Sequence, residues 1–204
     1  MSVPMKAGLV GRATADHLAS LAGQVPADQA IVEVGVFMAR TTVFLAQGAR
    51  SGLGAHVYGV DPWDLPGERY PYKWLNHPTK GKTRKLFTKP GTRHQAEQTV
   101  ARSGLKDQIT LIRGFSVEVA ESWEGPEIGF LFIDGDHQEA MVRADWDAWG
   151  WYLAPGAVVA FDDYHEDYPG VTTVVDELVA KKTLALADVI RRGNSALAVT
   201  RVAA

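Results

Sequence analysis

Five short apolar segments, each ending in glycine or aspartate, constrain the fold of this chain more than any other feature. Val, Ile, Leu and Phe dominate them, and they cover residues 31–35, 56–61, 109–114, 128–134 and 157–162. Continuous apolar runs of this length are typical of parallel strands that are covered on both faces. We therefore expect each segment to be a buried strand.

Helical patterns separate these strands, over residues 41–50, 92–103, 138–153 and 171–180. Pro155-Gly156 is expected to stop the third of these helices. The tail reads as two strands, 185–191 and 195–202, joined by a tight turn. Alternating strands and helices predict an α/β fold with a parallel sheet and right-handed crossovers, and the tail hairpin adds an antiparallel strand at one edge.

Composition removes several classes of function. The 204 residues include no Cys, which excludes disulfide scaffolds, thiolate nucleophiles and thiolate metal sites. The net charge of −3 gives no global basic field, so we expect neither nucleic acid nor a membrane surface as partner. The longest apolar runs fall far short of the ~18 residues of a membrane span, and the N-terminus lacks the pattern of a signal peptide. We expect a soluble, cytoplasmic protein with one domain over residues 1–204.

A basic and aromatic segment does not fit the strand–helix pattern. Between residues 65 and 106 the chain has ten Lys or Arg and two Glu, with three Tyr or Trp and one Phe between them. An insert of this length in a compact domain is often functional, so residues 65–92 are interpreted as a lid over the substrate. A solvated surface excursion and an arm that holds nucleic acid stay open as alternatives.

The turn after the first strand indicates the kind of cofactor. A phosphate-binding turn needs glycine where this chain has Glu33 and Met38, so phosphate-bearing cofactors are not expected there. One glycine, Gly35, beside a carboxylate suits an uncharged nucleoside with a cationic arm, and Asp61 after the second strand can accept ribose hydroxyls. These residues together suggest S-adenosylmethionine. The alternatives are that Gly35 only packs a helix on a strand and that Asp61 is a turn residue before Pro62.

Acidic side chains follow the fourth and fifth strands. Asp134 ends one, and Asp162 and Asp163 end the other; if the strands are neighbours, their ends lie roughly 5 Å apart. Crowded carboxylates raise each other's pKa, and a hard divalent cation such as Mg²⁺, Mn²⁺ or Ca²⁺ relieves the repulsion. His137, three residues after Asp134, is a candidate general base. The alternative is that these acids cap helices, for which Asp136 is the best candidate.

The sequence FIDGDH (132–137), followed by LAPGAVVAFDDYH (153–165), resembles the class I S-adenosylmethionine-dependent O-methyltransferases. Within them it is similar to the metal-dependent branch that includes the catechol, caffeoyl-CoA and macrocin-type sugar O-methyltransferases. The resemblance covers about residues 30–202 without the 65–92 insert, which has no counterpart in the family. It implies a Rossmann-like, doubly wound, seven-stranded sheet whose last strand is antiparallel.

The resemblance also implies roles for particular residues. The catalytic base falls on His137, where several members have Lys, and Asp134 joins it in catalysis. Ala39 stands where the family usually has a second glycine. The implied metal ligands are Asp134, Asp162 and Asp163, and the implied cofactor residues are Glu33, Gly35, Ala39, Asp61 and Ser116.

The implied activity is methyl transfer from S-adenosylmethionine to a hydroxyl of a small molecule, assisted by a divalent cation, with Mg²⁺ expected. The acceptor can be a sugar, a polyphenol or another natural product. The alternatives are a metal-independent small-molecule methyltransferase, a metal-dependent phosphoester hydrolase and a cofactor-binding module without catalysis. A homo-oligomer is left open as well.

Overall fold

The computed structural model describes residues 10–63, 92–192 and 195–203. They form an α/β fold around a seven-stranded sheet with strand order β3-β2-β1-β4-β5-β7-β6. Neighbouring strands among β1 to β5 pair in parallel, and β7 is antiparallel to both of its neighbours. The strands are β1 (Ala30–Val34), β2 (His56–Asp61), β3 (Ile109–Arg113), β4 (Ile128–Ile133), β5 (Leu153–Phe161), β6 (Leu184–Arg192) and β7 (Ser195–Val202). The predicted doubly wound sheet with an antiparallel last strand is confirmed.

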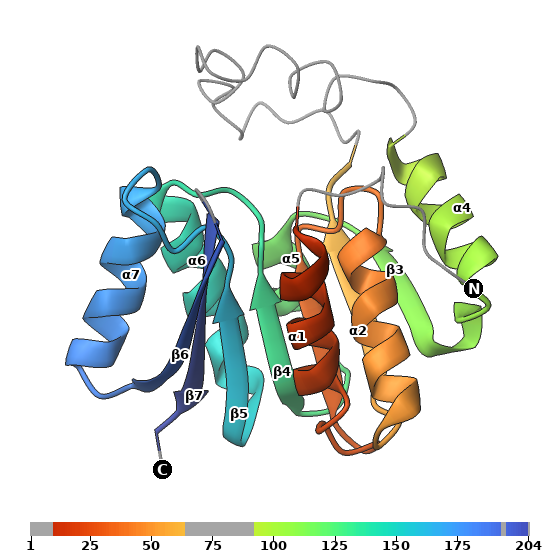
Figure 1. The fold of residues 1–204 in the computed structure, drawn as a ribbon, viewed down its shortest axis with the longest axis horizontal. Coiled ribbons are helices and arrows are strands. Elements are labelled where there is room, and N and C mark those ends of the chain that lie inside the picture. The colour runs from red at the N-terminus through yellow and green to blue at the C-terminus, as the bar shows by residue number, and fades with distance from the viewer. Residues whose placement is uncertain (1–9, 64–91, 193–194, 204) are drawn as a thin grey trace.

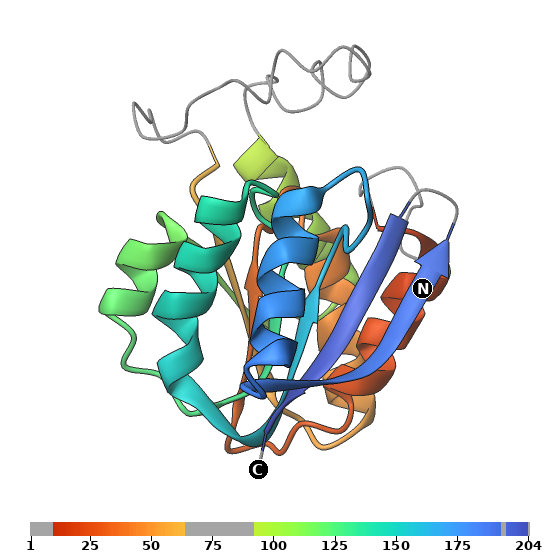
Figure 2. The same ribbon diagram turned by 90° about the vertical axis from the view of Figure 1, so that its left-hand side faces the viewer.

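Helices cover both faces of the sheet (Figures 1 and 2). One face carries α1 (Arg12–Ala22), α2 (Arg40–Ser51) and α4 (Thr92–Ser103). The other carries α5 (Ser116–Glu121), α6 (Glu139–Trp149) and α7 (Pro169–Ala180). Short 3-10 helices cover Lys106–Gln108 and Gly150–Tyr152.

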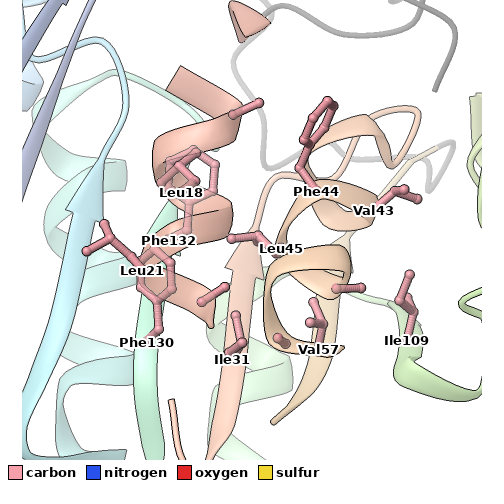
Figure 3. Packing of buried hydrophobic residues seen from close by; sticks show 14 of the residues in the cluster. Leu18, Leu21, Ile31, Val43, Phe44, Leu45, Val57, Ile109, Phe130 and Phe132 are labelled. Carbon is pink, nitrogen blue, oxygen red and sulfur yellow. The ribbon is translucent and has the colours of Figure 1, made fainter. Parts of the chain in front are cut away.

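The central strands are apolar along their whole length because both of their faces are buried. In β4, Phe130 and Phe132 belong to the core under α1 and α2, whereas Leu131 and Ile133 belong to the core under α5 to α7. Figure 3 shows Phe130 and Phe132 beside Leu18 and Leu21 of α1. This alternation follows the two-residue period of a strand, and burial of each such side chain contributes roughly 1.5–3 kcal/mol.

The predicted helix over 138–153 is too long. It ends at Trp149, and β5 already begins at Leu153, so Pro155-Gly156 lies inside the strand and does not stop the helix. The register explains the difference: Ile128 pairs with Leu153 and Phe130 with Val158, so β5 has extra residues opposite β4 at this irregularity. A bulge tolerates both a proline and a glycine with positive φ, here +74° at Gly156.

The tail hairpin at one edge of the sheet is confirmed, but the antiparallel strand is not the edge strand itself. The antiparallel strand β7 lies between β5 and β6, and β6 forms the edge. Residues 196–200 of β7 are all buried, whereas residues 185–188 of β6 are exposed. The burial of β7 follows from its place between two neighbouring strands, whereas β6 has a neighbour on one side only.

Two helices were not predicted, α1 and the short α5. In α1 the buried residues include Ala15, Leu18 and Ala22, spaced as one helix face, so the sequence held a usable signal. Except for Thr92, the first residue of α4, the 65–92 insert lies outside the described residues. In the described ranges no helix is both long and apolar enough to span a bilayer.

Candidate active site

The carboxyl ends of β1, β4 and β5 lie side by side at the upper edge of the sheet in Figure 1. Val34 pairs with Ile133, which pairs with Phe161, so Gly35, Asp134 and Asp162 each follow one of three paired strand ends. The chain order reverses at β1, between β2 and β4, and ligands of open α/β sheets bind beside such a reversal. Parallel pairing therefore brings predicted residues from three distant segments to one edge.

Gly35 is required by the close approach of two backbones. Its φ is +91°, and a Cβ built there would lie 2.1 Å from the carbonyl oxygen of Asp134. Any other residue would push β1 and the end of β4 apart. The close approach is between the turn after β1 and the end of β4, and not the packing of a helix on a strand that was the alternative for this glycine.

Strained backbone is concentrated around this edge. Phe37, Ala39, Trp63 and Asp163 all have positive φ although none is glycine. Ala39, at φ 60°, is the N-cap of α2 and is fully buried. Such conformations cost roughly 1–3 kcal/mol each and cluster at functional sites.

Asp61 fixes the turn that follows β1. Its Oδ2 accepts the N–H groups of Val36 (2.9 Å) and Phe37 (2.8 Å), and its Oδ1 accepts that of Trp63 (2.6 Å). Burial raises the pKa of Asp61, and these three bonds oppose the rise. A carboxylate offers about four acceptor positions, so about one remains for a hydroxyl group.

Glu33 is the next-to-last residue of β1 and has no exposed surface. The Thr42 hydroxyl donates a hydrogen bond to Oε2, and Oε1 has no hydrogen-bond partner within the described residues. Burial raises the pKa of Glu33 well above its usual range; the Thr42 bond opposes this, and the charges of Asp134 and Asp61 add to it. Burial in the sheet therefore favours the protonated, neutral form of the Glu33 side chain.

The three predicted metal ligands are brought together. Burial raises the pKa of Asp134 and of Asp162 well above the usual range, and the charge of Asp163 adds to both shifts. A hydrogen bond between the Asp134 and Asp162 side chains opposes the rise at Asp134. Asp162 is buried, and its Oδ1 has no hydrogen-bond partner in the described part of the chain.

Their chemistry fits a hard divalent cation, because buried carboxylate oxygens with raised pKa values gain most from such an ion. The positions of these side chains do not yet match a metal-binding geometry. Among residues 10–63, 92–192 and 195–203 no group of three or more His, Asp or Glu side chains could hold a metal ion as it stands. The predicted ligands are therefore neighbours without forming a finished metal centre.

His137 lies between two of these carboxylates. Its Nδ1 is 3.5 Å from Asp163 Oδ2, and its Nε2 is 3.9 Å from Asp134 Oδ1. Neither ring nitrogen has a hydrogen-bond partner among the described residues, and only 15% of the side chain is exposed. The arrangement can receive a proton and stabilise the resulting imidazolium. Asp136 instead binds the backbone N–H of Gln138 at 2.8 Å, close to the capping role considered for it.

Ser116 is the first residue of α5. Its hydroxyl accepts a hydrogen bond from Trp149 Nε1 at 2.9 Å and is also hydrogen-bonded to the carboxyl group of Asp145. Burial raises the pKa of Asp145 to about 6, the Ser116 bond opposes this, and the charge of Asp136 adds to it. The hydroxyl of Ser116 is thus engaged within the protein.

Sequence reasoning missed Asp145, Trp149 and Tyr168. A signal existed for the first two, because Val142, Asp145 and Trp149 are the buried positions of α6 and share one helical face. An acid on an apolar helix face implies a buried partner. Tyr168 carried no local signal, since only the fold brings its ring within 4.8 Å of the His137 ring.

Comparison with known proteins identifies the family and the fold. Residues 32–164 match the family described as methyltransferase domain. Rv0187 from MTB, solved with cofactor bound, is 17% identical over 98% of this chain and 84% of its own, with a TM-score of 0.69. An O-methyltransferase from Bacillus cereus, in complex with SAH, is 16% identical over 98% of this chain and 84% of its own, with a TM-score of 0.67.

The O-methyltransferase TomG from Streptomyces achromogenes, involved in tomaymycin synthesis and solved with SAM, is 15% identical over 96% of this chain and 82% of its own, at a TM-score of 0.69. At these identities a structural likeness shows the fold alone, whereas the family match covers well over half of the chain. This chain therefore belongs to the methyltransferase domain family and has the fold of the class I S-adenosylmethionine-dependent O-methyltransferases, as its sequence resemblance implied.

Proposed function

We propose that this methyltransferase transfers the methyl group of S-adenosylmethionine to a hydroxyl of a small molecule, with His137 as general base. One observation carries the proposal. A nearly buried histidine with two unbonded ring nitrogens lies between the carboxylates of Asp163 and Asp134, and the backbone of Asp134 meets the Gly35 turn. General base catalysis needs such a group within hydrogen-bond reach of the acceptor hydroxyl.

The electrostatics of the edge support a cationic cofactor. Burial raises the pKa of Glu33, Asp61 and Asp134, so their charged forms are disfavoured unless a positive group lies nearby and lowers these pKa values again. Bound S-adenosylmethionine supplies an electrophilic methyl group on a positively charged sulfur, and its positive groups suit acidic surroundings. The neighbours solved with SAM or SAH have the same fold.

We assign the cofactor contacts to the turn and strand ends. Gly35 and Ala39 have no side chain larger than a methyl group, so backbone there can approach the ligand. Asp61 would use its remaining acceptor position for a ribose hydroxyl. Because the Ser116 hydroxyl is engaged, its contact with the adenosine would come from the backbone at the start of α5.

His137 accepts the proton of the acceptor hydroxyl, and the residues around it stabilise the resulting charge. As the acceptor oxygen bonds to the methyl carbon, its proton moves to a His137 ring nitrogen, and the electron pair of the sulfur–carbon bond stays with sulfur. The carboxylates of Asp163 and Asp134, 3.5 and 3.9 Å away, stabilise the imidazolium. General base catalysis of this kind contributes about 10²–10⁴-fold in rate, and holding two reactants in one cleft contributes more.

Asp134, Asp162 and Asp163 are the residues that would hold a divalent cation, with Mg²⁺ expected. The raised pKa values of Asp134 and Asp162 support this part of the proposal. A cation there would lower the pKa of a bound acceptor hydroxyl. The second candidate is a metal-independent methyltransferase, favoured by the closeness of the Asp134 and Asp162 carboxyl groups, which can share one proton in place of a cation.

Substitution of His137 tests the base. Purified full-length protein is given S-adenosylmethionine and a panel of catechols, phenols and sugars with vicinal hydroxyls, and methylated product is measured. We expect His137→Gln to lower kcat by about 100-fold or more while cofactor affinity, measured by calorimetry, changes little. His94→Gln, on the exposed face of α4, is the matched control and should keep full activity. Unchanged turnover in His137→Gln would contradict the assignment.

Removal of metal tests the ion separately. With a divalent cation in the mechanism, EDTA should abolish turnover and added Mg²⁺ should restore it, while binding of S-adenosylmethionine persists. Turnover that resists EDTA, with His137→Gln still inactive, would establish the metal-independent candidate. Release of inorganic phosphate from a phosphoester panel, without methyl transfer, would refute both candidates in favour of a hydrolase.

A further inference from the structure

Tyr168, which no sequence motif indicated, contacts the proposed base and its carboxylate partner together. Its ring lies edge to face with the His137 ring, with centroids 4.8 Å apart and planes at 70°. Its hydroxyl is hydrogen-bonded to the side chain of Asp163. Asp163 Oδ2 in turn lies 3.5 Å from His137 Nδ1. The three side chains thus form a closed set of contacts.

The backbone around Tyr168 holds this set in place. Tyr168 is the N-cap of α7; its N–H donates to the carbonyl of His165 at 2.9 Å, and its carbonyl accepts from Val171 at 3.0 Å. A Cβ on Gly170 would lie 2.5 Å from the carbonyl oxygen of His137 and 2.4 Å from the N–H nitrogen of Glu139. The start of α7 therefore packs directly on the backbone that carries His137, and the two rings cannot drift apart independently.

Asp163 needs such support. Its backbone has φ 56°, a left-handed conformation that an aspartate adopts at some cost. Its carboxylate is near His137 without a hydrogen bond to either ring nitrogen. The bond from the Tyr168 hydroxyl is a contact that directs the Asp163 carboxylate, and the Tyr168 ring limits rotation of the imidazole.

We propose that Tyr168 is a positioning residue for methyl transfer: its hydroxyl directs the Asp163 carboxylate and its ring orients His137 toward the acceptor hydroxyl. The inference rests on the proposed function, in which His137 accepts the proton. It assigns Tyr168 no contact with the reacting atoms. Its effect on the rate passes entirely through His137.

Conservative substitution with a double-mutant cycle tests the inference. We expect Tyr168→Phe, which keeps the ring, to lower kcat about tenfold, the size expected for one hydrogen bond to a charged group, with the KM for the acceptor unchanged within twofold. Tyr168→Leu, which also removes the ring, should lower kcat further. Tyr164→Phe is the matched control, because Tyr164 lies in the same loop but donates to Asp176 at 2.5 Å, and within the described residues it makes no ring contact with His137. It should keep full kcat.

The cycle separates positioning from a merely structural role. In the His137→Gln background, Tyr168→Phe should have no further effect on kcat, because it acts through His137. An additive tenfold loss in that background, unchanged kcat in Tyr168→Phe, or a loss confined to acceptor KM would each overturn the inference. Full turnover in the single variant His137→Gln would refute the proposed function itself. The inference about Tyr168 is refuted separately, when His137→Gln loses turnover but Tyr168→Phe does not behave as expected.

Discussion

The buried carboxyl group of Asp145 is predicted to destabilise the native state at neutral pH. Asp145 is 4% exposed on the inner face of α6, and burial raises its pKa from an ordinary 3.8 to about 6. The native state therefore binds this proton more tightly than the unfolded chain does. The stability that the protonated acid contributes is complete below pH 3.8 and is lost as the pH rises to about 6.

The magnitude follows from the two pKa values. A rise from 3.8 to about 6 corresponds to about 3 kcal/mol, since each pH unit is worth about 1.36 kcal/mol. Asp145→Asn keeps the shape and an acceptor oxygen for Ser116 but cannot ionise. We expect the variant to exceed the natural protein in free energy of unfolding by about 1.6 kcal/mol at pH 5 and by about 3 kcal/mol at pH 8.

Urea denaturation followed by tryptophan fluorescence at pH 5, 6, 7 and 8 measures this difference. Asp147→Asn is the matched control, because Asp147 lies on the same helix with an exposed side chain. Its effect should stay within about 0.5 kcal/mol at every pH. A pH-independent difference for Asp145→Asn, or a net loss of stability at pH 8, would show that the carboxylate is better compensated than its burial implies.

Two further predictions concern β1 and its turn. Gly35→Ala should destabilise the fold by about 3 kcal/mol or more, because the new Cβ meets the Asp134 carbonyl at 2.1 Å in a backbone with φ +91°. Gly104→Ala, with positive φ but open surroundings, should cost only about 1 kcal/mol in the same urea titration, and equal losses would refute the close-approach reasoning. Glu33→Gln should raise the thermal midpoint at pH 8 and lose this advantage toward pH 4, because burial raises the pKa of Glu33. A lower midpoint at pH 8 would mean that the ionised form is stabilised in the sheet.

Local sequence signals determined the strands and most helices of this protein. Apolar runs ended by glycine or aspartate predicted β1 to β5, because strand burial and turn chemistry are encoded within a few residues. The same strand ends supplied the predicted site residues, and the FIDGDH and FDDYH segments carried the resemblance to the family that residues 32–164 match. The assigned roles of His137 and the aspartates stay predictions.

Tertiary structure alone decided what these residues contact. Pairing of β4 with β1 placed Gly35 against Asp134, and the loops after β4 and β5, which also pair, placed His137 between Asp134 and Asp163. The insertion of β7 inside the sheet, the bulge at Pro155 and the contact of Tyr168 with His137 had no local signal. Side-chain periodicity is set by neighbours along the chain, whereas strand order, burial of charge and contacts between loops depend on which distant segments share a core.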